Sequence, residues 1–161
     1  MDLNKMYINI LNDTLKKKLD SLKEIMTETQ KQKELLDNTP FDVEKYEESF
    51  AVKDVLINNI LELDQGFESL YDRIKDEIKN NKDKYKEDII ITQTLIQELT
   101  DISIKLQILE SNNKMKMEGY FSNQKTEIKR KKITNKIALG YYKNMTDQHQ
   151  TGQSYFIDKK K

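Results

Sequence analysis

The chain contains no cysteine, and its 161 residues include only one proline, one histidine and four glycines. Without cysteine there is no disulfide, no thiolate metal site and no cysteine nucleophile. A single histidine, His149, excludes the paired Glu-x-x-His motifs of a di-iron helical bundle. With so little proline and glycine, few positions force a helix to end. The sequence is therefore suited to long helices, which offer surfaces for partners more readily than pockets for chemistry.

The charges balance, because 28 lysines and arginines face 28 aspartates and glutamates. No field of one sign surrounds the whole chain, so the composition does not favour nucleic acid as a partner. No apolar run approaches the roughly 20 residues needed to cross a bilayer, and the first residues lack the apolar centre of a signal peptide. We expect a soluble, cytoplasmic chain with one main domain and no membrane insertion.

Apolar residues recur every three or four positions over three stretches, which predicts three helices. The first spans residues 2–37 and ends before Pro40, because the residue before a proline avoids helical angles. The second spans residues 42–81, with Asp42 as its N-cap. A polar break follows, and the third helix spans residues 85–142. Together they predict an all-α fold, an elongated antiparallel three-helix bundle or coiled coil over residues 1–146, with a flexible tail at 147–161.

Two residues in the second helix stand out. Lys53 falls in the apolar register, where its stem can lie on apolar surface while its amine reaches water. Gly66 costs about 1 kcal/mol relative to alanine inside a helix, and it suggests a close crossing of another helix.

The third helix is longer than its neighbours, which has consequences for its distal part. From about Asn113 onward it either overhangs the other two helices or folds back near Gly119. An overhanging helix leaves its apolar face exposed unless a partner covers it. Ile133, Ile137 and Tyr141 continue a four-residue spacing there, a face that either packs back on the bundle or binds a partner's apolar helix. The candidate partner-binding residues are Met117, Tyr120, Ile133, Ile137, Tyr141, Tyr142, Met145 and Tyr155.

Charges are unevenly distributed along the balanced chain. Acidic residues dominate positions 42–77, and basic residues dominate positions 125–143. The basic stretch is interpreted as a solvated helix face, as a contact for an acidic partner or for the acidic second helix, or as a nucleic-acid or membrane site. Its shortness and the neutral total disfavour the last of these. No convergent set of catalytic residue types appears, so we expect no enzyme, no cofactor, no metal and no small-molecule substrate.

Several segments resemble the FlgN-type flagellar export chaperones. The second helix begins with an aspartate and carries a lysine and paired aliphatics, the third has Leu-x-x-x-Asn near its middle, and the tail combines tyrosine, aspartate and lysines. These residues are Asp42, Lys53, Leu56, Ile57, Leu109, Asn113, Tyr155, Asp158 and Lys159. The resemblance implies a cytoplasmic type III secretion chaperone whose C-terminal part holds the helical C-terminal segments of hook–filament junction proteins. It also implies delivery of these clients to a component of the export gate.

The same long apolar stripes fit a second hypothesis, a structural coiled-coil protein that self-associates without enzymatic activity. Lys53 and Asn113 interrupt the stripes and disfavour a continuous zipper. A monomer that forms a one-to-one complex with a client would exclude this alternative.

Overall fold

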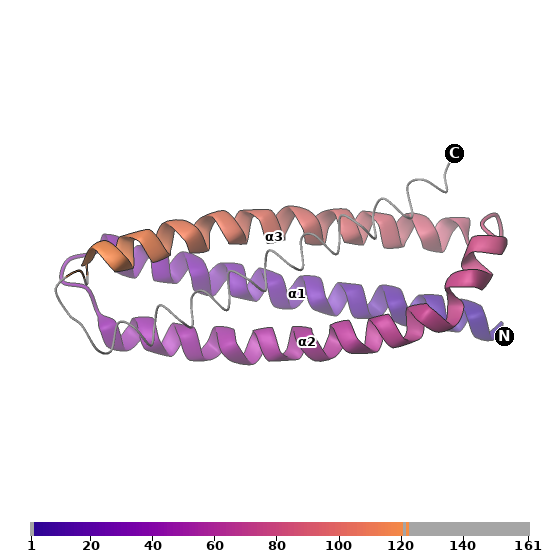
Figure 1. Ribbon diagram of the computed structural model, residues 1–161, viewed down its shortest axis with the longest axis horizontal. Coiled ribbons are helices and arrows are strands. Elements are labelled where there is room, and N and C mark those ends of the chain that lie inside the picture. The colour runs from indigo at the N-terminus through magenta and orange to yellow at the C-terminus, as the bar shows by residue number, and fades with distance from the viewer. Residues whose placement is uncertain (1, 121, 123–161) are drawn as a thin grey trace.

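The computed structural model describes residues 2–120 and 122, and the described part folds into three long helices without strands (Figure 1). They are α1 (Leu3–Asp37), α2 (Val43–Asn80) and α3 (Lys86–Tyr120). The helices lie side by side, with α2 antiparallel to the other two, so that α1 and α3 run in the same direction. The predicted all-α, elongated three-helix bundle is confirmed.

The helix boundaries follow from capping side chains. Asp42 Oδ1 accepts a hydrogen bond from the Lys45 N–H at 3.1 Å, which confirms Asp42 as the N-cap of α2. Asp2 caps α1 in the same way, accepting from the Asn4 N–H at 3.0 Å. Each cap satisfies a backbone donor that has no partner within its helix. The first two predicted helices therefore agree with the structure to within about a residue at each end.

Helix α1 is the central element of the bundle. It packs closely against both α2 and α3, whereas the backbones of α2 and α3 remain farther apart. The largest apolar cluster accordingly takes most of its buried residues from α1 and α3, and only one from α2: Leu15, Leu19, Leu22, Ile25, Ile60, Leu95, Ile96, Leu99 and Leu106. Full burial of such a side chain is worth about 1.5–3 kcal/mol, so this cluster is the main source of the bundle's stability.

The expectation that the third helix overhangs from about Asn113 is wrong for the described residues. Asn113 and Met117 are each only 1% exposed, so α3 packs against the bundle into its last turn. The reason is geometric, since α3 runs alongside α1 in the same direction and Asn113 still reaches the Thr29 backbone, well inside α1. The predicted continuation of the helix to residue 142 lies outside the described residues.

Gly66 does not mark a close helix crossing. It is exposed, and a Cβ built on it meets no atom of the described part of the chain within 4 Å. The expectation drawn from this glycine is therefore wrong, and the close approach of helices involves other positions.

Candidate functional site

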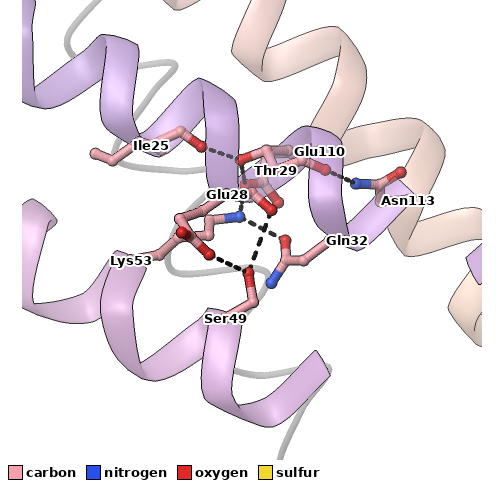
Figure 2. Close-up of polar contacts among 8 residues, drawn as sticks. All are labelled: Ile25, Glu28, Thr29, Gln32, Ser49, Lys53, Glu110 and Asn113. Atoms are coloured by element: carbon pink, nitrogen blue, oxygen red, sulfur yellow. Dashed lines mark hydrogen bonds and ion pairs between the residues drawn. The ribbon is translucent and has the colours of Figure 1, made fainter. Parts of the chain in front are cut away.

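Lys53 lies in the interior of the bundle, where all three helices contribute to its surroundings (Figure 2). Its side chain is 1% exposed, and its Nζ donates to Gln32 Oε1 of α1 at 2.8 Å and to the Glu110 carboxylate of α3. The expectation that this amine reaches water is wrong. The sequence places the lysine in an apolar register, but only the fold brings a carboxylate to it, and a buried ammonium requires such a partner.

A layer of polar side chains surrounds this ion pair, and we call it the polar layer. Thr29 Oγ1 lies 2.7 Å from the Ile25 carbonyl oxygen and 3.2 Å from Glu110 Oε1, so its proton can be donated to either oxygen. Asn113 Nδ2 donates to the Thr29 carbonyl oxygen at 3.1 Å. Figure 2 shows how these contacts cross between helices. The members of the polar layer are Glu28, Thr29, Gln32, Ser49, Lys53, Glu110 and Asn113.

The electrostatics of the polar layer reflect its burial. Desolvation lowers the pKa of the Lys53 amine, while the Glu110 carboxylate opposes that shift. Within the described part of the chain, Gln32 Nε2 and Asn113 Oδ1 are buried without a hydrogen-bond partner. The contacts therefore satisfy most but not all of the polar atoms. These partners face one another in only one alignment of the three helices. The hydrogen bonds and the ion pair of the polar layer therefore favour that alignment over others.

A second polar contact lies nearer the other end of the bundle. Lys18 of α1 pairs with Asp64 of α2 at 2.6 Å, and the two side chains are 4% and 31% exposed. Burial lowers the pKa of Lys18, and the Asp64 charge opposes the shift. Asn12 Nδ2 also donates to the Asp88 carbonyl oxygen at 3.2 Å, which links α1 to the start of α3. Buried polar contacts thus join α1 to both of its neighbours.

A surface groove of about 450 Å³ lies between α1 and α2 beside the polar layer. Side chains of both charge signs line it, among them Glu28, Lys31, Glu34, Lys45 and Glu48. It therefore presents no field of one sign to a ligand. Among residues 2–120 and 122, no group of three or more histidine, aspartate or glutamate side chains is placed to hold a metal ion.

Helix α3 is apolar on two opposite faces. Its inner face contains the buried Leu99, Leu106 and Met117, while Ile108 and Met115 on the outer face are 58% and 68% exposed. An ordinary surface helix has a single apolar stripe. In the described part of the chain, no helix has the combination of length and apolarity needed to span a membrane. The outer face of α3 is thus an apolar surface on a helix whose other face already packs against the bundle.

The candidate binding residues divide into three groups. Met117 is buried and packs with Phe41 and Tyr46, so its side chain belongs to the interior of the bundle. Tyr120 is 56% exposed, and its ring meets the Phe41 ring edge-on with centroids 5.0 Å apart. The remaining candidates lie outside the described residues, namely Ile133, Ile137, Tyr141, Tyr142, Met145 and Tyr155.

The sequence interpretation missed Phe41, although a signal for it was present. Phe41 directly precedes the N-cap Asp42, and Tyr46 occupies the fourth helical position of α2. Apolar residues at these two positions often pack together as a hydrophobic staple. Their rings lie 5.5 Å apart in an edge-on arrangement, and the pair forms the base on which Met117 and Tyr120 rest.

No protein-family model, no curated protein and no solved structure matches this chain.

Proposed function

We propose that this chain is a cytoplasmic export chaperone of the FlgN type, which acts by binding and not by catalysis. Its proposed client is the helical C-terminal segment of a hook–filament junction protein, which it delivers to the export gate. The observation that carries the proposal is the exposed aromatic ring of Tyr120 at the end of α3, held in place by Phe41. The identity of the client comes from the resemblance of the sequence.

The exposed apolar side chain at this end of the bundle is Tyr120, the last residue of α3, which is 56% exposed. The Tyr120 ring rests against Phe41 on one side, which fixes its position without covering it. An aromatic ring held in this way contacts a partner at a low cost in side-chain entropy. The end of α3 is therefore suited to an apolar residue of an incoming helix.

The sequence after Tyr120 supports an extension of this surface. Ile133, Ile137, Tyr141 and Met145 recur at intervals of four, the spacing of one helical face. An amphipathic client helix presents the same spacing, so the two faces can match along their length. Methionine adds a flexible contact that adapts to different client side chains. We propose that these residues, together with Tyr120, form the client-binding surface.

The test is a pull-down of the purified C-terminal helical segment of a hook–filament junction protein. The double variant Ile137→Asp with Tyr141→Asp should keep its helical content by circular dichroism and lose client capture. Tyr120→Asp should weaken capture. Val55→Asp is a matched control, because Val55 is 62% exposed on α2, away from the end of α3, and should capture the client as the wild type does.

Undiminished capture by the double variant would count against the proposed surface. Failure of the wild-type chain to bind any such segment would count against the proposed function itself. Light scattering of the complex adds stoichiometry, which separates client binding from self-association.

A further inference from the structure

We propose that the outer face of α3 is a self-association surface, which pairs antiparallel with the α3 of a second copy of this chain. This inference does not depend on the proposed client. It rests on the apolar residues of that face and on the distribution of charge beside them.

The apolar part of the surface is a seam along the outside of α3. Ile90, Ile104, Ile108 and Met115 are 43%, 38%, 58% and 68% exposed. They fall within a series of eight positions whose spacing alternates between four and three residues, as in a coiled-coil seam. The seam positions are Ile90, Thr94, Gln97, Asp101, Ile104, Ile108, Ser111 and Met115, and all of them are exposed. Half of them are polar, so we expect a reversible, concentration-dependent dimer and not a permanent one.

The charged residues beside the seam indicate that its binding partner is a second copy of this chain. Glu98 and Lys105 are exposed and lie one behind the other on the same side of the seam, seven residues apart. In a parallel pair the two copies of Glu98 would lie on opposite sides of the seam, and neither would meet a Lys105. An antiparallel copy centred near Ile102 places each Glu98 opposite the other copy's Lys105, which makes two ion pairs. The surface is therefore complementary to itself, as a two-fold symmetric interface requires.

The same centre also aligns the apolar ends of the seam. Ile90 and Met115 lie at almost equal distances from Ile102 in sequence, on opposite sides of it. In the antiparallel arrangement, Ile90 of one copy thus meets Met115 of the other at both ends. Apolar contacts at the ends and ion pairs near the middle favour the same orientation and the same register.

The first test is sedimentation velocity of the full chain over concentrations from micromolar to several hundred micromolar. The wild type should shift from monomer to dimer across this range. Ile104→Glu with Ile108→Glu should stay monomeric with unchanged helical content, because both side chains are exposed. Val55→Glu is the matched control and should dimerise as the wild type does. A wild type that stays monomeric throughout, or a double variant that dimerises normally, would overturn the proposal.

Charge reversal tests the pairing of Glu98 with Lys105. Glu98→Lys and Lys105→Glu should each raise the dimer dissociation constant by about tenfold, because attraction becomes repulsion at two symmetric positions. The combined variant Glu98→Lys with Lys105→Glu should restore the wild-type constant. If the combined variant remains as weak as the single ones, the two residues are not partners and the proposed register is wrong.

The absence of cysteine allows a direct test of orientation. Thr94 and Ser111 lie almost equally far from Ile102, so they face each other only in the antiparallel dimer. A mixture of Thr94→Cys and Ser111→Cys proteins should form a disulfide-linked dimer under mild oxidation, while neither variant should cross-link alone. Cross-linking of each variant with itself would show a parallel pair and overturn the proposal. Neither position belongs to the proposed client surface, so this result and the pull-down are independent.

Discussion

Lys53 of α2 and Glu110 of α3 form an ion pair inside the bundle, with 1% and 2% of their side chains exposed. The Lys53 amine also donates to Gln32, so the pair connects both outer helices to α1. Desolvation of the two charges offsets much of their attraction, so such a pair adds little net stability. What it adds is alignment, because sliding either helix by one turn would leave a charge buried without its partner.

Removing one member of this pair should be far more damaging than removing both. Glu110→Leu leaves the Lys53 ammonium buried and unpaired, and we expect it to lower the free energy of unfolding by about 3–5 kcal/mol. The double variant Lys53→Met with Glu110→Leu fills the same space with apolar groups, and we expect it to be as stable as the wild type or more stable. Urea unfolding of the wild type, both single variants and the double variant measures the coupling.

The surface pair of Lys31 with Glu28 provides the control, since the Lys31 side chain is 60% exposed. Lys31→Met should change stability by less than about 1 kcal/mol. If Glu110→Leu costs no more than this control, the pair does not occupy a buried position in solution.

The helices could be predicted from the sequence because their signals are local. A period of three to four residues, the single Pro40 and the capping Asp42 lie within a few residues of what they determine. The burial of Lys53 was not predictable in this way, because its partner Glu110 is 57 residues away and meets it only in the folded bundle. The same holds for Asn113, which interrupts the apolar stripe. It donates a hydrogen bond to the Thr29 carbonyl oxygen, which is 84 residues away in the sequence.

The candidate site was predicted less completely than the fold. The sequence interpretation placed Met117 and Tyr120 on one binding surface, but the structure buries the first and exposes the second. They differ because Met117 is aligned with Leu106 and Leu99 and packs against Phe41 and Tyr46, whereas Tyr120 is the last residue of α3 and rests at the end of the bundle against Phe41. The apolar outer face of α3 was also hidden in the sequence, since apolar residues on two sides of a helix blur its periodicity.

The stability of the N-terminal end of the bundle should depend on pH through Asp2. Its Oδ2 accepts from Lys84 Nζ at 2.8 Å, and this hydrogen bond holds the pKa of the carboxyl below its ordinary value of 3.8. A carboxyl with a lower pKa in the folded state stabilises above pH 3.8, and this contribution is lost as the pH falls through the folded-state pKa. Asp2→Asn keeps a capping side chain but removes the charge.

We therefore expect Asp2→Asn to be less stable than the wild type at neutral pH, and the difference to disappear as the pH falls through the folded-state pKa of Asp2. Urea unfolding at successive pH values measures this difference. Asp13→Asn, at an exposed position of α1, serves as a control for the loss of one negative charge. A difference between Asp2→Asn and the wild type that persists in strong acid would show that the effect is not the charge of Asp2.

The last turns of α3 should be as firmly packed as its middle. Met117 is 1% exposed against Phe41 and Tyr46, so Met117→Ala leaves a cavity and should cost about 2–5 kcal/mol in urea unfolding. Met115→Ala is a control two residues away, at a side chain that is 68% exposed, and should change stability by less than about 0.5 kcal/mol. Amide exchange at Asn113 and Met117 should then be nearly as slow as at Leu95. The prediction fails if the two alanine variants lose the same free energy of unfolding, or if the Asn113 amide exchanges rapidly. Either result would mean that the end of α3 separates from the bundle in solution, as an overhanging helix does.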